Sequence, residues 1–180
     1  MAKIRITGGE WRSRLVKVTE APGLRPTPDR VRETLFNWLG QDLTGLSCLD
    51  LFAGSGILGF EAASRGARPV VFVERDAKVF RILDENTRIL NPTCFERVCS
   101  DALKFAPFAI GQGRRFDLIL LDPPYRQGWL DKLWPLLTEL AADGGRIYVE
   151  AEMAVDPPAP WQVVKSGRAG QVFYHLLERA

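Results

Sequence analysis

The stretch from Cys48 to Gly59, with the sequence CLDLFAGSGILG, decides the fold of this chain. Its first five residues predict a short apolar strand, and the residues from Ile57 onward predict the start of a helix. The glycines Gly54, Gly56 and Gly59 allow a tight turn and let a ligand approach the main chain closely. A strand, a glycine turn and a helix N-terminus in this order are typical of a cradle for a nucleotide-like ligand.

Asp50 separates two interpretations of this cradle. The spacing Gly-x-Gly-x-x-Gly also occurs in dinucleotide-binding proteins. Asp50 lies inside the strand, however, where its carboxylate would repel a pyrophosphate and attract a ligand with an ammonium and a sulfonium group. The block Asp50-x-Phe52-x-Gly54-x-Gly56 resembles the first motif of the S-adenosylmethionine-dependent methyltransferases, and this resemblance implies S-adenosylmethionine as cofactor and a Rossmann-like fold.

Beyond this stretch, segments of strand length and helix length alternate along the chain. The expected strands lie at 46–52, 69–73, 95–99, 116–121 and 146–150, and the expected helices at 57–65, 77–90 and 130–142. This alternation predicts an α/β fold with a doubly wound, mostly parallel sheet. Two further segments, 161–165 and 172–178, predict a C-terminal antiparallel hairpin.

The N-terminal part of the chain predicts a separate small element. Residues 3–18 alternate in polarity around a Gly-Gly pair, which predicts a β-hairpin. Thr27 as N-cap, Pro28 in the first turn and Gly40 as a stop predict a helix between them. We expect residues 1–22 to form a basic hairpin appendage and residues 23–180 to form the methyltransferase domain.

Composition bounds the class of protein. The 180 residues are 46% hydrophobic and 26% charged, which is typical of a soluble globular chain. No apolar run approaches the roughly 20 residues of a membrane helix, and the N-terminus has no apolar signal core. The three cysteines have no metal-ligand spacing. We therefore expect a reduced, cytoplasmic protein without a metal or a membrane, and nothing demands more than a monomer.

Charge is distributed unevenly along the chain. Residues 1–32 carry a net charge of +5 and the remaining residues carry −3. A basic arm on a mildly acidic body predicts a polyanionic partner, against the alternative of a solvated surface hairpin. Trp11 either stacks on a base beside these arginines or packs in the core. The candidate RNA-binding residues are Arg5, Trp11, Arg12, Arg14, Arg25, Arg30 and Arg32.

Acidic residues follow the expected parallel strands, at the sheet edge where such folds bind ligands. Glu74 would accept hydrogen bonds from ribose hydroxyls, a role that nicotinamide-dependent enzymes share. Asp101 would accept from an adenine amino group, or would be an N-cap. The expected cofactor-binding residues are Asp50, Phe52, Gly54, Gly56, Glu74, Arg75, Asp101 and Ala102.

The motif Asp122-Pro123-Pro124-Tyr125 follows the fourth strand and is the most specific signal in the chain. Two prolines hold the backbone extended and add no N–H groups, so carbonyl oxygens can face a site without competing donors. Asp122 and a carbonyl would accept hydrogen bonds from an exocyclic amino group, and Tyr125 would stack on its ring. We expect these four residues to be catalytic, mainly by aligning the amine with the methyl carbon.

Two blocks of sequence near the N-terminus narrow the resemblance from methyltransferases in general to one family. Residues 5–14 (RITGGEWRSR) and 24–39 (LRPTPDRVRETLFNWL), together with the Asp122–Tyr125 motif and residues 147–150 (IYVE), resemble the RsmD family, bacterial 16S ribosomal RNA guanine-N2 methyltransferases. The resemblance implies methylation of guanine 966 in 16S rRNA within an assembled small subunit. Ser13 stands where the family pattern has glycine.

Other functions share parts of this pattern. A DNA adenine-N6 methyltransferase uses the same four-residue motif but needs a target-recognition domain, for which 180 residues leave little room. A protein-glutamine or small-molecule N-methyltransferase would not need the basic arm. A nicotinamide-dependent dehydrogenase does not account for Asp50 or the Asp122–Tyr125 motif, and a non-catalytic RNA-binding module would fit the arm alone.

Overall fold

A seven-stranded sheet runs through the centre of the protein, in a computed structural model that describes residues 2–19 and 26–180. Its strands are β3 (Cys48–Asp50), β4 (Val70–Glu74), β5 (Phe95–Cys99), β6 (Phe116–Leu121), β7 (Ala141–Ala151), β8 (Trp161–Ala169) and β9 (Val172–Arg179). Their order is β5-β4-β3-β6-β7-β9-β8, and the first five are mutually parallel. The predicted parallel sheet and its C-terminal antiparallel hairpin are thus confirmed.

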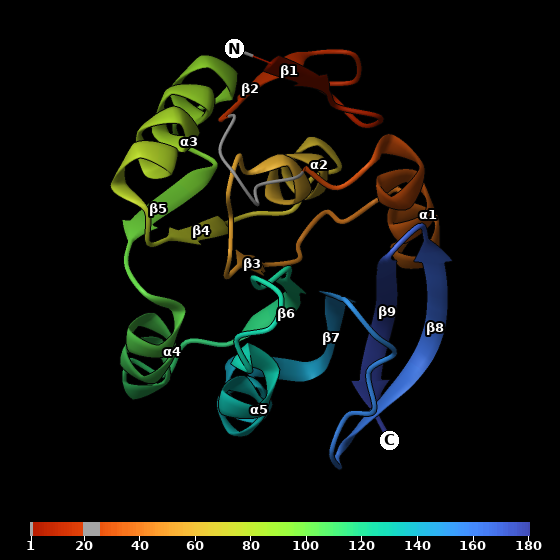
Figure 1. Ribbon diagram of the computed structural model, residues 1–180. Coiled ribbons are helices and arrows are strands. Elements are labelled where there is room, and N and C mark those ends of the chain that lie inside the picture. The colour runs from red at the N-terminus through yellow and green to blue at the C-terminus, as the bar shows by residue number, and fades with distance from the viewer. Residues whose placement is uncertain (1, 20–25) are drawn as a thin grey trace.

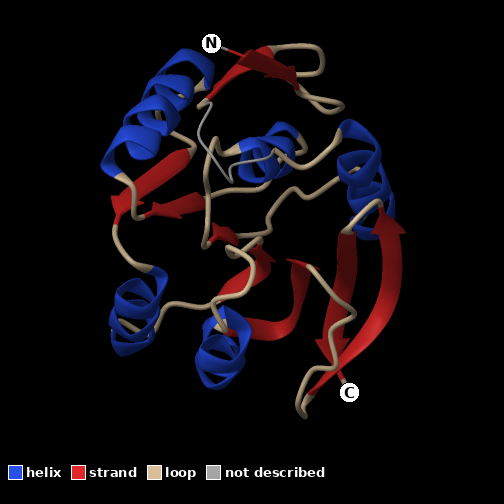
Figure 2. Cartoon of the chain, viewed as in Figure 1, coloured by secondary structure: helices blue, strands red, loops and turns tan. Residues whose placement is uncertain are grey.

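Helices cover both faces of this sheet (Figures 1 and 2). On one face lie α1 (Asp29–Leu39), α2 (Ile57–Ser64) and α3 (Ala77–Leu90), and on the other lie α4 (Ala102–Gly111) and α5 (Trp129–Leu140). No bounds were predicted for α4, although Asp101 was considered as an N-cap; the helix forms despite Pro107, with Phe105, Ala106 and Ala109 buried against the sheet. Among the described helices, none is both long and apolar enough to cross a membrane.

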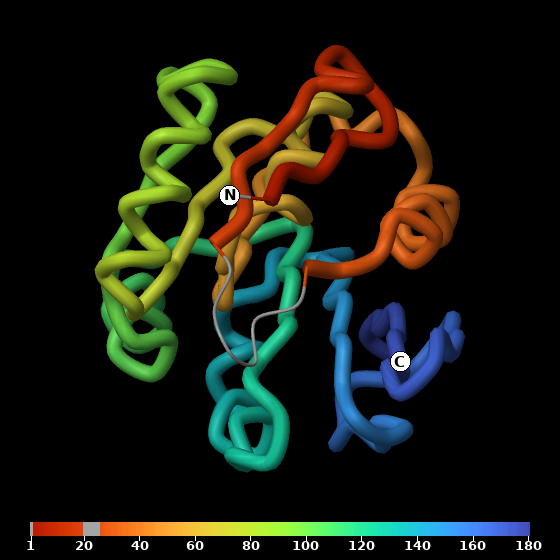
Figure 3. Tube along the Cα trace, turned by 45° about the horizontal axis from the view of Figure 1, so that its top comes forward, coloured from red at the N-terminus to blue at the C-terminus, as the bar shows by residue number. Residues whose placement is uncertain are grey.

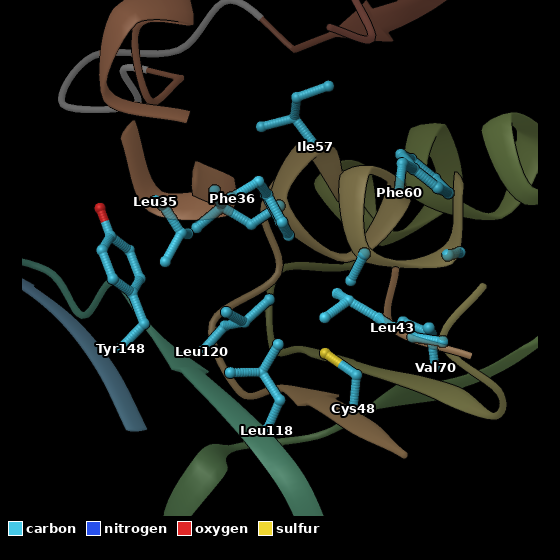
Figure 4. Close-up of a cluster of buried hydrophobic side chains, with 14 of the residues drawn as sticks. Leu35, Phe36, Leu43, Cys48, Ile57, Phe60, Val70, Leu118, Leu120 and Tyr148 are labelled. Atoms are coloured by element: carbon cyan, nitrogen blue, oxygen red, sulfur yellow. The ribbon is translucent and has the colours of Figure 1, made fainter. Parts of the chain in front are cut away.

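The larger hydrophobic core lies between the sheet and α1 and α2. Figure 4 shows Leu118 and Leu120 of β6 facing Leu35 and Phe36 of α1, with Tyr148 of β7 at one side of the cluster. All five side chains are fully or almost fully buried. Apolar burial on this scale holds the parallel strands in position, and it therefore determines which side chains lie at the carboxyl edge of the sheet.

A two-stranded hairpin of β1 (Ala2–Arg5) and β2 (Leu15–Val18) packs over α2 (Figures 1 and 3). Its antiparallel pairing confirms the predicted hairpin. Ile6, Trp11 and Val16 are buried in the same core as α1 and α2. The expected boundary between residues 22 and 23 lies outside the described residues, so the division into appendage and domain stays a prediction.

The start of α1 differs from the prediction by one residue. Pro28, and not Thr27, is the N-cap, and no side chain caps the helix. Thr27 is instead buried, and its hydroxyl donates to Glu150 Oε1 at 2.7 Å. The Thr27 hydroxyl therefore bonds to Glu150 of β7, in place of the N-cap hydrogen bond to the main chain of α1 that the sequence favoured. The predicted stop at Gly40 is confirmed, since Gly40 is the C-cap with a φ of 93°.

Candidate active site

The glycine loop after β3 forms an open cradle between two acids. Gly54 has a φ of 56°, and a Cβ built there would meet no atom within 4 Å. Its N–H donates to Glu74 Oε1 at 2.9 Å, and the Gly59 N–H donates to Asp50 Oδ2 at 3.2 Å. A ligand can approach Gly54 from solvent beside the Glu74 carboxylate, with the Asp50 carboxylate buried beneath the loop, which fits a cation with adjacent hydroxyl groups.

Asp50 is nearly inaccessible to solvent at 2% exposure. Its pKa is raised to about 7, chiefly by burial and also by the charges of Glu74 and Glu150, while the hydrogen bond from Gly59 opposes this rise. The side chain therefore gains from a nearby positive charge much more than an exposed aspartate would. This environment matches the predicted attraction for a cationic ligand.

The remaining predicted cofactor residues lie along the same edge. Asp101 is the N-cap of α4, where it accepts from the Leu103 N–H at 2.7 Å, so the capping role is confirmed and the adenine role stays a prediction. Ala102 beside it is buried. The rings of Phe52 and Trp129 meet edge to face at 5.2 Å, and the Arg75 guanidinium lies 5.6 Å from the Trp129 ring centre.

Pro123, Pro124 and Tyr125 of the motif line a pocket of about 230 Å³. The same pocket is lined by residues of α5 and by residues 150–156, which end β7 and follow it. Tyr125 is 39% exposed, so part of its ring is free to contact a planar ligand. Burial raises its pKa to about 12, with help from the nearby charges of Asp122, Glu150 and Glu152, and the phenol stays protonated at neutral pH.

Glu150 joins Asp122 at this edge and was not assigned a role from the sequence. Leu121 of β6 pairs in register with Val149 of β7, so Asp122 and Glu150, the next residue of each chain segment, lie side by side. The pKa of each carboxyl group is raised, chiefly by burial. Asp50 also raises the pKa of Asp122. The signal for Glu150 was available, because it lies at the carboxyl end of the fifth parallel strand, one residue before Ala151, much as Glu74 ends the second. Three acids from three strands thus converge on one site.

The candidate RNA-binding residues divide into two groups in the structure. Arg5, Arg12, Arg14 and Arg30 are exposed. Arg32 is fully buried and pairs with Glu61 and Asp29, so assigning it to RNA was wrong. It shares a helical face with Leu35, Phe36 and Leu39, a spacing that indicates an inward side chain.

The assignment of Trp11 to RNA was also wrong. The residue is only 5% exposed, and its ring centre lies 5.8 Å from that of Phe95, so it packs in the core and is not available to stack on a base. Arg25 lies outside the described residues, and its role stays a prediction.

Comparison with known proteins places this arrangement among methyltransferases. The family model described as Conserved hypothetical protein 95 matches residues 4–178. The protein named Ribosomal RNA small subunit methyltransferase D of Escherichia coli (strain K12) is 42% identical over 182 residues, covering 98% of this chain and 90% of that protein.

Solved structures agree with this result. A structure described as a putative methyltransferase, yhhF, from Escherichia coli has a TM-score of 0.87 at 43% identity and covers 99% of this chain and 98% of its own. A SAM-dependent methyltransferase from Agrobacterium tumefaciens has a TM-score of 0.63 at 24% identity, over 78% of this chain and 50% of its own, which shows a shared fold alone.

Proposed function

The chain belongs to the RsmD family of ribosomal RNA methyltransferases, and we propose that it methylates the N2 amino group of guanine 966 in 16S rRNA of the small ribosomal subunit. The observation that supports this proposal is the motif after β6: Pro123 and Tyr125 line a pocket of about 230 Å³, and Asp122 directly precedes them in the chain. Their acceptor groups and exposed ring match the donors and flat face of a guanine.

S-adenosylmethionine is the methyl donor of this reaction. Asp50, Gly54, Gly56 and Glu74 would hold it, because Gly54 is open to a ligand between two acids and Gly56, with a φ of 88°, makes the turn against Leu83 and Phe60. When bound, it supplies an electrophilic methyl group. We also propose that Phe52, Arg75, Asp101 and Ala102 complete its site.

The chain's own residues would align the amine for in-line attack. Asp122 and a main-chain carbonyl of the proline pair would accept the two amino N–H groups, which turns the nitrogen lone pair toward the methyl carbon. Tyr125, protonated at neutral pH, would present its ring to the base without adding charge. Alignment of this kind and fixed partial charges account for most of the rate that such a site can provide.

The exposed arginines Arg5, Arg12, Arg14 and Arg30 would bind the RNA backbone, while the acidic edge receives the base. A triple variant in which alanine replaces Arg5, Arg12 and Arg14 should bind the subunit with a weaker salt dependence. The slope of the logarithm of the binding constant against the logarithm of salt concentration should fall by about one unit per lost phosphate contact. An unchanged slope would remove the hairpin from the RNA site. We further propose a cytoplasmic monomer that acts on the assembled subunit.

The direct test uses small subunits from cells that lack this gene. We expect incubation with methyl-labelled S-adenosylmethionine to place label in N2-methylguanosine at position 966, as read by nucleoside digestion and site mapping. Naked 16S rRNA, incubated in parallel, should accept less label. Label in N6-methyladenosine of added DNA, or in protein glutamine, with none in the RNA, would contradict the proposal and favour those acceptors.

A further inference from the structure

Glu150 is held at one position in the site. The side chain is 3% exposed, and its Oε1 accepts from Thr27 Oγ1 and from the Tyr148 hydroxyl, both at 2.7 Å. Figure 4 shows the Tyr148 hydroxyl pointing out of the hydrophobic cluster that buries its ring. Two donors from two different segments thus fix one oxygen and leave the other carboxylate oxygen for another partner.

Asp122 is the neighbour that can fill this role, because it follows Leu121, which pairs in register with Val149, the residue before Glu150. Two carboxyl groups that meet side by side can hydrogen-bond only if they hold one proton, because two carboxylates offer only acceptors. Within residues 2–19 and 26–180, no salt bridge reaches Asp50, Asp122 or Glu150. The groups near the pair are themselves acidic or phenolic: Asp50 from β3, Tyr125 after β6 and Tyr148 from β7, with Tyr174 of β9 beside Tyr148.

We propose that Glu150 is a positioning residue for methyl transfer, which holds the Asp122 carboxyl toward the amine and shares one proton with it when the base site is empty. The inference rests on the proposed function, because the amine is the one that Asp122 would receive. The hydrogen bonds from Thr27 and Tyr148 then have a role in the site, because they hold Glu150 in place and oppose the rise that burial causes in its pKa.

The shared proton has a defined course through the reaction. Binding of the amino group brings N–H donors to Asp122, and the proton of the pair leaves to solvent. The amine nitrogen then forms the N–C bond with its lone pair, the S–C bond breaks, and its electrons stay on sulfur. The proton that the new ammonium loses passes to Asp122, whose proton affinity Glu150 keeps high.

Glu150→Gln separates this role from a structural one. The glutamine amide oxygen can still accept from Thr27 and Tyr148, so the fold should be retained, which thermal unfolding verifies. Its amide nitrogen would donate to Asp122, and the negative charge that favours the shared proton is gone. Asp122 should therefore ionise at lower pH in this variant.

Two readouts test the inference. In substrate-free protein, infrared difference titration should detect a protonated carboxyl near neutral pH in the wild type that Asp122→Asn and Glu150→Gln both lose. In the methylation assay, the acidic limb of kcat/KM should move to lower pH in Glu150→Gln by at least about one unit, and kcat should fall about tenfold with KM nearly unchanged. Tyr148→Phe and Thr27→Val, which keep the charge, should not move the limb to lower pH.

The outcomes distinguish this inference from the function on which it rests. The same infrared titration in Glu150→Gln as in the wild type, or an unmoved acidic limb, would overturn the inference. A wild type that shows the shared proton but transfers no methyl group to small subunits would contradict the proposed function and leave the pair standing.

Discussion

Two clusters of buried charge lie in this protein, and they are built in opposite ways. Between the hairpin, α1 and α2, the Glu61 carboxylate pairs with Arg32 at 2.6 Å and with Arg65 at 2.8 Å. It also accepts from the main chain and hydroxyl of Thr7. At the carboxyl edge of the sheet, Asp50, Asp122 and Glu150 face one another with no described salt bridge. We call these the paired cluster and the acidic cluster.

The difference separates a structural site from a reactive one. The paired cluster satisfies its charges internally, and so it fastens the hairpin to the helix that follows the glycine loop. In the acidic cluster, burial and the neighbouring carboxylates raise the pKa values of Asp50 and Asp122, so a cationic ligand would compensate charge there. The two clusters meet at Thr27, whose carbonyl accepts from Arg32 Nε at 3.0 Å and whose hydroxyl donates to Glu150.

Removing the centre of the paired cluster should have the largest effect on stability. Glu61→Ala leaves Arg32 and Arg65 buried without their carboxylate, and we expect the free energy of unfolding to fall by about 3–5 kcal/mol. Urea unfolding measures this loss. Glu10→Ala is the matched control, because Glu10 meets Arg68 only at 4.0 Å on the surface, and it should change little. A Glu61→Ala protein as stable as the control would show that the pairs do not hold the hairpin.

Asp50 in the acidic cluster should make cofactor binding depend on pH. Because its pKa is raised to about 7, the carboxyl is largely protonated at pH 6, and affinity for a cationic cofactor should rise as pH rises through 7. The expected gain is up to about tenfold per pH unit below the pKa. Calorimetric titration from pH 6 to 8 tests this. Asp50→Asn should remove the dependence, and a dependence that persists would locate it in another group.

The raised pKa of Asp50 should also make the free energy of unfolding depend on pH. The folded state binds the Asp50 proton more tightly than the unfolded chain does, so this contribution is complete below pH 3.8 and is lost as pH rises through about 7. Wild-type stability should therefore fall relative to Asp50→Asn over that window, as unfolding at several pH values would reveal. An equal stability difference at pH 4 and pH 8 would argue against the shift.

The smallest expected effect concerns the hairpin that the paired cluster holds. Ser13 has a φ of 72°, a conformation that L residues adopt at a cost of roughly 1–2 kcal/mol. Ser13→Gly should therefore raise the free energy of unfolding by about 1 kcal/mol, after allowing for the entropy of glycine. Gly9→Ala is the opposite control, since a Cβ there would lie 2.2 Å from the Ser64 carbonyl oxygen, and it should destabilise. A destabilised Ser13→Gly would mean that the serine side chain stabilises this turn.

The sequence predicted the elements around the acidic cluster well, for a physical reason. Periodicity and glycine placement are local signals, so α3 at Ala77–Leu90 and β6 at Phe116–Leu121 match their expected bounds. Asp50, Glu74 and Asp122 were found because parallel strands end at one edge. Glu150 obeys the same rule, but its significance depends on a hydrogen bond to a residue 123 positions earlier in the chain.

The paired cluster could not be predicted in the same way. Thr7, Arg32 and Glu61 are far apart in the sequence, and an arginine among other arginines was interpreted as part of a surface that binds RNA. Only the packing of α1 and the hairpin on α2 brings the three together. Charge counted along the chain therefore indicated a basic arm, but it could not distinguish the exposed Arg30 from the buried Arg32.

The claim that the acidic cluster is the reaction centre is tested most directly by single-turnover methyl transfer with Asp122→Asn. Unmodified small subunits and labelled S-adenosylmethionine would be used, with cofactor and subunit binding measured in parallel. We predict near wild-type binding of both and a rate of label transfer into N2-methylguanosine lower by on the order of 10²–10³-fold. A variant that binds and transfers label at the wild-type rate would contradict the account.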